Sequence, residues 1–180
     1  AQLQYMFVGG DIEKLSETKA DRAKESARLK WIAYKDQFFS TVLIAGDAFE
    51  STQMESTPQN ALSRHIKEYK TTASLPFDIT GKKNIDLKYY FGPNHYNTLK
   101  AYDKDVEKSE RLHLNELVPL GWKIVAWINK ALVIPMFDLF SSWGLHIGIV
   151  TLLMTLVIKL IILPFVFASY KSSAKMRVLK

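Results

Sequence analysis

The first 118 residues carry short apolar or alternating runs, separated by charged and turn-forming stretches. Runs of this length, rich in β-branched and aromatic residues, predict strands. The predicted strands cover residues 3–8, 38–45, 62–69, 71–79 and 85–91, with a turn at 81–84. In the last strand Ile85, Leu87, Tyr89 and Phe91 alternate with polar neighbours, the period expected of a half-buried strand. This pattern predicts a mainly β domain, a sandwich or part of one.

The segments between these strands offer fewer apolar positions. Residues 12–30 interleave ten charges of both signs with Ser, Thr and Ala, which predicts a solvated loop or exposed helix. Trp31, Tyr34 and Phe38 recur at helical spacing and predict a short helix. Residues 46–60 are expected to be loop, and a short helix is expected from Pro93 to about Ala101.

The pattern changes after Gly121. Within residues 122–134, one helical side is apolar and the other carries Lys123 and Lys130. The apolar side comprises Ile124, Ile128, Ala131 and Leu132. Three tryptophans are candidate anchors at a membrane–water interface, namely Trp122, Trp127 and Trp143. We expect an amphipathic interfacial helix, interrupted near Pro135. A core helix of the β domain is the alternative.

Residues 145–167 contain a single charge, Lys159. As a helix these 23 residues would extend about 34 Å, enough to cross a hydrocarbon layer of about 30 Å. We therefore expect a transmembrane helix that ends or kinks at Pro164.

Polar residues inside this span share one side. Thr151, Thr155 and Lys159 follow at intervals of four, so each step rotates by only about 40°. A charge at mid-membrane usually faces a bundle interior or a water-filled cavity, which favours a substrate groove lined by these three residues. Alternatively, Lys159 snorkels toward the end of its own helix, about 12 Å away, and the threonines bond their own backbone.

Charge is distributed unevenly along the chain. All 18 acidic residues lie at or before Asp138, whereas the last 42 residues carry five basic residues and no acid. Four of the five form a basic tail beyond the span: Lys171, Lys175, Arg177 and Lys180. A one-sided basic tail predicts a cytoplasmic location, which places the β domain outside. Because the basic excess accompanies apolar sequence, a nucleic-acid-binding role is not expected.

No pattern of enzyme chemistry is present. The chain has no cysteine, which excludes disulfides, thiolate metal sites and thiol nucleophiles. The four histidines have no metal-ligand spacing, and no phosphate loop or nucleophile elbow occurs. We therefore expect no catalytic residues, metal or cofactor. The chain opens without Met or leader and closes in a helix-compatible run, so we interpret it as a piece of a longer protein.

The order of features resembles the YidC/Oxa/Alb membrane protein insertases, in the bacterial form with a large periplasmic domain. The matching residues are Trp31, Phe39-Ser40-Thr41, Tyr90-Phe91-Gly92-Pro93, Gly121-Trp122, Trp143-Gly144, Ile149-Val150-Thr151, Lys159, Leu163-Pro164, Tyr170, Ser173, Ala174-Lys175-Met176-Arg177 and Leu179. The stretch from Gly121 onward is the more specific part.

The resemblance implies four parts. Residues 1–118 would be the C-terminal part of a periplasmic β-supersandwich and 119–143 an amphipathic interfacial helix. Residues 144–167 would be the second transmembrane helix of the whole protein, and 168–180 the start of a cytoplasmic helical region. The family usually has arginine in its hydrophilic groove, where this chain has Lys159. Lysine keeps the charge but loses the bidentate fork.

The resemblance further implies an inner-membrane insertase and chaperone without covalent chemistry. Its partners would be nascent membrane proteins, the phospholipid bilayer and, in some cases, the Sec translocon. Two rivals stay open: a single-pass anchored periplasmic binding module, and a transporter subunit that uses Lys159 in an ion path.

Overall fold

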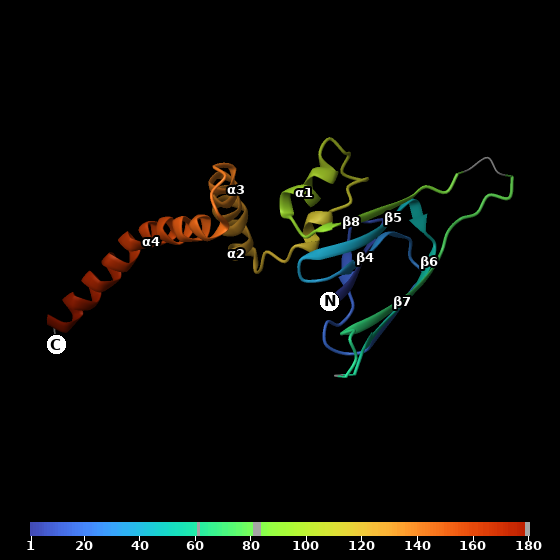
Figure 1. Cartoon of the computed structure of the whole chain (residues 1–180), viewed down its shortest axis with the longest axis horizontal. Helices are drawn as coiled ribbons and strands as arrows, with labels where there is room; N and C mark the ends of the chain where they lie inside the picture. The colour runs from blue at the N-terminus through green and yellow to red at the C-terminus, as the bar shows by residue number, and fades with distance from the viewer. Residues whose placement is uncertain (61, 81–83, 179–180) are drawn as a thin grey trace. The chain divides into compact units, whose positions relative to one another are not determined.

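The computed structural model describes residues 1–60, 62–80 and 84–178. These residues form two compact units, Ala1–Pro119 and Leu120–Lys180, which are shown in Figure 1 and treated separately below. Three of the four residues of the expected turn at 81–84 lie outside the described residues, as do Leu179 and Lys180.

The first unit contains two antiparallel sheets within its described residues. One sheet has the order β2-β1-β4-β5-β8, with bounds β1 (Gln2–Phe7), β2 (Ile12–Lys14), β4 (Leu29–Lys35), β5 (Phe39–Phe49) and β8 (Leu87–Pro93). The other has the order β3-β6-β7, with bounds β3 (Asp21–Glu25), β6 (Ser51–Pro58) and β7 (Lys67–Ser74). A β-rich domain followed by apolar helices, the fold class expected from the sequence, is confirmed.

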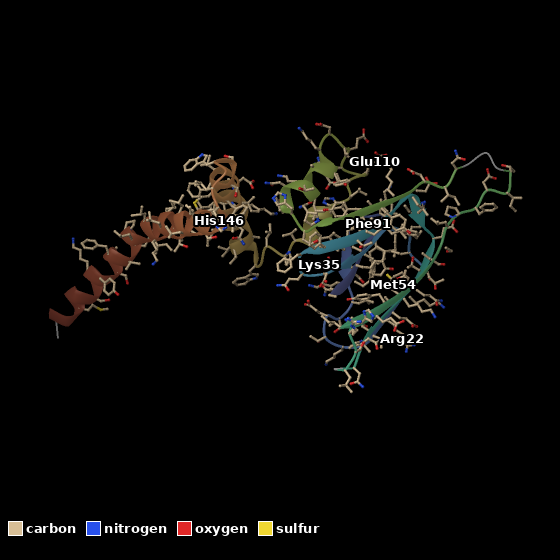
Figure 2. All side chains as sticks on the ribbon, viewed as in Figure 1. Arg22, Lys35, Met54, Phe91, Glu110 and His146 are labelled. Atoms are coloured by element: carbon tan, nitrogen blue, oxygen red, sulfur yellow. The ribbon has the colours of Figure 1, made fainter. Side chains whose placement is uncertain are left out.

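The larger sheet is buried on both faces at its centre. On one face, Ile32 of β4 packs with Phe49 and with Met54 of the smaller sheet, and Figure 2 shows Met54 among the side chains between the sheets. On the other face, Trp31 packs with Leu99 and Leu114. Those two residues come from the short helices α1 (Tyr96–Lys100) and η2 (Leu114–Leu117). Burial of both faces explains why β4 is apolar throughout much of its length.

Several expectations for this unit were wrong. Trp31 and Tyr34 lie in strand β4, and Phe38 lies in the bend before β5, so the helical spacing is coincidental; β4 is apolar because the smaller sheet covers one of its faces and α1 and η2 cover the other. Residues 12–30 contain β2 and β3, short strands that tolerate charge because each has exposed positions. Residues 46–60 are largely strand, since β5 runs to Phe49 and β6 follows.

Strand β6 escaped detection because its buried positions are mostly polar. Thr52, Met54 and Ser56 point inward and alternate with exposed neighbours, a period of two that hydrophobicity alone does not reveal. The two strands expected over residues 62–79 are one strand, β7 (Lys67–Ser74). Its outward positions are charged or hydroxylic and its inward ones include Tyr69, whose pKa burial raises to about 12.

The side of strand β8 that is buried is opposite to the side that the sequence predicted. Tyr90 is buried and its hydroxyl donates to the Pro93 carbonyl at 2.7 Å, whereas Tyr89 and Phe91 are exposed and stack on each other. The strand lies at the edge of its sheet, so its apolar side has fewer covering residues than the pattern suggested. The short helix expected after Pro93 is present as α1.

The second unit is helical. Helix α2 (Lys123–Ile128) continues through one π-helical stretch, η3 (Asn129–Val133), into α3 (Ile134–Ser142). The π-helical stretch ends at Val133, two residues before Pro135, near which the sequence predicted an interruption. Gly144, with φ of 70°, precedes α4 (Ile147–Val178). Helix α4 does not end at Pro164 as one alternative expected, but continues to Val178.

The indole of Trp31 links the larger sheet to a distant loop and provides a test of this fold. Trp31 is fully buried, and its Nε1 donates to the Leu112 carbonyl at 2.6 Å. Trp31→Phe should lower the opening free energy of the β1, β4 and β5 amides by about 2–4 kcal/mol, through the lost bond and lost packing. Hydrogen exchange of the chain in neutral detergent measures this. The matched control Trp122→Phe, at an exposed site, should leave protection unchanged; equal protection in both variants would contradict the packing described.

Candidate functional site

Helices α3 and α4 pack against each other through one face of each. Met136 and Phe140 of α3 are buried against Val150 of α4. The α4 residues at this contact recur at helical spacing: Val150, Leu153, Met154, Val157 and Ile158. This apolar seam fixes which side of α4 is left uncovered within the described second unit.

The uncovered side carries the three polar residues predicted as a groove. At about 100° per residue, Lys159 lies roughly opposite the seam that contacts α3, Thr155 lies about 130° from the centre of the seam, and Thr151 lies at its margin, about 90° away. All three are exposed, and together with Gly148, Leu152 and Leu156 they line a cavity of about 510 Å³ along α4. We call these six residues the α4 groove. The three predicted residues therefore share one exposed face of α4, as their spacing by four requires, and α4 alone lines this shallow depression among the described residues.

The threonine hydroxyls are partly engaged within α4. The Thr151 hydroxyl donates to the Ile147 carbonyl at 2.9 Å, and the Thr155 hydroxyl donates to the Thr151 carbonyl at 2.9 Å. Such back-bonding satisfies the hydroxyl hydrogen but leaves oxygen lone pairs directed outward. The groove thus presents hydrogen-bond acceptors from the threonines and donors from the Lys159 ammonium.

Lys159 has no ion-pair partner among the described residues. In hydrocarbon such a charge costs about 2.5–3.5 kcal/mol on insertion scales. The cost falls if the ammonium meets water or an acidic group. The position of Lys159 at one end of the groove makes either contact geometrically open to it.

A polar residue that the sequence patterns did not reveal begins α4. His146 Nδ1 accepts the Gly148 backbone N–H at 3.3 Å, and the His146 carbonyl accepts the Ile149 N–H at 2.8 Å. Figure 2 places His146 where α3 and α4 meet. Histidine is an uncommon N-cap residue, so the usual Ser, Thr, Asp or Asn signal was absent. This cap starts the helix directly before the groove.

The three candidate anchors are all exposed. Trp122 and Trp127 flank or lie in α2, and Trp143 follows α3, where its ring lies 5.3 Å from that of Phe140. Exposed Ile124 and Ile128 lie in the same helix. An exposed mixture of indole and aliphatic side chains suits an interfacial environment.

Among the described residues, two helices are long and apolar enough to cross a membrane: Ile124–Ser142, with mean hydropathy 1.5, and Ile147–Ser173, with 2.6. By length and composition, the helix Ile124–Ser142 can therefore either cross the membrane or lie in its interface. Of the basic tail, Lys171 is exposed on α4, and the backbones of Lys175 and Arg177 belong to the same helix. The side chains of Lys175 and Arg177, and all of Lys180, lie outside the described residues.

Comparison with known proteins gives one consistent result. The family model described as the YidC periplasmic domain matches residues 4–135. The chain is 48% identical to the membrane protein insertase YidC of Parabacteroides distasonis, over 99% of the chain and 28% of that protein. It is 49% identical to that of Bacteroides fragilis, over 100% and 29%, and 36% identical to that of Porphyromonas gingivalis strain W83, over 99% and 28%. The chain spans less than a third of the length of these relatives.

The placement of the first apolar helix can be tested by the sidedness of three exposed residues. In an otherwise cysteine-free full-length protein, single cysteines at Thr72, Ser141 and Ser172 are treated with a membrane-impermeant thiol reagent from outside the inner membrane. If Ile124–Ser142 is interfacial, Thr72→Cys and Ser141→Cys should react and Ser172→Cys should not, because only α4 crosses. Two spanning helices would instead place residues 72 and 172 on one side and residue 141 on the other.

Proposed function

The chain belongs to the YidC family of membrane protein insertases, and on this premise we propose that it supplies part of an insertase acting through a hydrophilic intramembrane groove. The observation that carries the proposal is the α4 groove, in which Thr155 and Lys159 lie on the side of α4 turned away from α3 and Thr151 lies at the margin of that side. The relatives of known name are insertases, and the family match covers residues 4–135.

We assign the parts of the chain as follows. Residues 1–118 are the C-terminal part of the periplasmic sandwich, 119–143 the interfacial helix, and 144–167 a transmembrane helix. Residues 168–180 begin a cytoplasmic region. The family match to a periplasmic domain reaches residue 135, within α3, which supports a periplasmic-side location for the helix before α4. The acid-free tail supports the opposite side for Lys171.

The groove lowers the cost of moving polar client segments across the bilayer. An Asp, Lys or Arg at the centre of a helix in lipid costs about 2.5–3.5 kcal/mol. A depression that carries an ammonium and two hydroxyl oxygens, open along α4, allows such a segment to stay partly hydrated while the apolar helix of the client enters lipid. The positive charge of Lys159 favours acidic client segments.

Each groove residue has a distinct part in this scheme. Lys159 supplies charge and three donors, whereas Thr151 and Thr155 supply acceptor oxygens because their hydrogens are bound to the helix backbone. No bond in the client is made or broken, so no catalytic residue, metal or cofactor is required. Nascent membrane proteins and lipid are the partners, and the Sec translocon is a further one for clients delivered through it.

Family membership favours this scheme over an anchored binding module or a transporter subunit. A helix that serves only as a membrane anchor does not require a lysine within the span. It also does not require polar residues spaced by four along one side. A transporter would require Lys159 to exchange ions or protons with a second titratable group. Among the described residues of α4, Lys159 has no acidic neighbour in its span.

Substitution of Lys159 in the full-length protein tests the groove. Lys159→Arg should preserve insertion of single-spanning clients that carry acidic extracytoplasmic segments, because the charge is kept. Lys159→Leu should impair it although the variant accumulates in the membrane, since removing the charge eases insertion of α4 itself. Protease protection of several clients measures insertion, and Ile162→Leu is a control on the same helix. Normal insertion of all clients by Lys159→Leu would remove Lys159 from the mechanism.

A further inference from the structure

The first unit contains a cavity bordered by several charged residues, distant in sequence from the α4 groove. It has a volume of about 490 Å³, within the range of small-ligand sites. Its walls come from α1, the following turn η1 (Ala101–Asp103), and the segment that leads into η2. The charged and imidazole side chains that line it are Lys100, Lys104, Arg111, His113 and Asp103. We call it the α1–η2 cavity.

The charge in this cavity is predominantly positive. Lys100, Lys104 and Arg111 each contribute a cation, and none of the three forms an ion pair among the described residues. Arg111 is oriented by its Nε, which donates to the Val106 carbonyl at 3.4 Å. This contact leaves the terminal N–H groups of the guanidinium for another acceptor.

The single carboxylate in the lining is already used. Asp103 accepts the backbone N–H of Leu112 at 2.6 Å and that of His113 at 2.9 Å, one on each oxygen. These bonds hold His113 in a left-handed conformation at φ 48° and tie the Arg111 segment to η1. Asp103 therefore builds the cavity wall, and two of its four acceptor sites are occupied by backbone.

Other acids of the same loop do not line the cavity. Asp105, Glu107 and Glu110 are exposed outside it, and Glu110, labelled in Figure 2, lines a neighbouring depression. The loop as a whole is nearly neutral, whereas the cavity lining carries three cations and one carboxylate, and the Glu116 carboxylate lies 3.7 Å from Nδ1 of His113. Fold, rather than composition, thus concentrates cations in the cavity.

We propose that the α1–η2 cavity is a binding site for a phosphate-type oxyanion. Three cations around one concave space, with an arginine held at its Nε, match an anion that accepts several charge-assisted hydrogen bonds. The amide-bearing residues Asn97 and Asn115 complete the polar lining. This site is independent of the α4 groove and of the insertion mechanism.

Two sources supply this chemistry: the phosphate of an anionic lipid headgroup, and a soluble phosphate ester. The chain provides a reason to include lipid. Only seven residues separate Asn115 from Lys123, the first residue of α2, and eight steps of extended chain reach at most about 28 Å. A connection of this length allows the first unit to approach a bilayer surface that α2 contacts.

The test uses backbone amide chemical shifts of Lys104, Leu112 and His113 in the whole chain. One arm adds inorganic phosphate to the chain in neutral detergent, at ionic strength held constant with chloride. The other compares phosphatidylcholine nanodiscs with and without phosphatidylglycerol. Variants Lys104→Gln and Arg111→Gln remove lining cations, and Lys108→Gln removes one from the same loop outside the cavity. The Lys104 side chain makes no hydrogen bond, ion pair or ring contact with the described residues, so Lys104→Gln should leave the fold intact.

A saturable shift should appear, weakened about tenfold by Lys104→Gln or Arg111→Gln and less than twofold by Lys108→Gln. A shift with inorganic phosphate only assigns the site to soluble phosphate esters. A shift with phosphatidylglycerol, with or without a response to inorganic phosphate, assigns it to headgroups. The proposal is overturned if neither arm gives a saturable shift, or if Lys108→Gln weakens binding as much as Lys104→Gln.

Discussion

A lysine ammonium within a helix of hydrocarbon length is the constraint on which the functional account depends. Lys159 is the sole charge in residues 145–167, and burying it in lipid costs about 2.5–3.5 kcal/mol. Helix α3 covers the opposite side of α4 through Val150 and its neighbours, so it leaves the lysine side open. Thr151 and Thr155 extend the same side toward the start of α4. Both threonine hydroxyls donate to carbonyls of α4 itself, as the snorkelling alternative expected, so the case for a hydrated groove depends on the charge of Lys159.

The β domain follows a different principle, in which burial comes from partners on two faces. Strand β4 is apolar over much of its length because Ile32 faces the smaller sheet and Trp31 faces α1 and η2. The bond from Trp31 to Leu112 joins this sheet to the loop that also builds the α1–η2 cavity. The wall of that cavity therefore rests directly on the core.

The sequence predicted features that depend on local periodicity. Helix α4 and its polar stripe follow from an apolar run of sufficient length and from residues spaced by four. Strands β3 and β6 were missed because charged and hydroxyl side chains occupy their faces, and β8 was assigned the wrong inward side because its cover comes from elsewhere in the fold. The α1–η2 cavity was not predictable, since it brings together side chains of α1, η1 and the segment leading into η2, which no local pattern indicates.

Water contact along α4 tests the central claim most directly. In the full-length protein in its native membrane, single cysteines are placed along α4 and their alkylation by N-ethylmaleimide is timed, because the reaction requires a hydrated thiolate. Thr151→Cys and Thr155→Cys should react at least about tenfold faster than Leu153→Cys and Val157→Cys, which face α3. Equally slow reaction at all four positions would contradict a hydrated groove and leave Lys159 as a snorkelling residue.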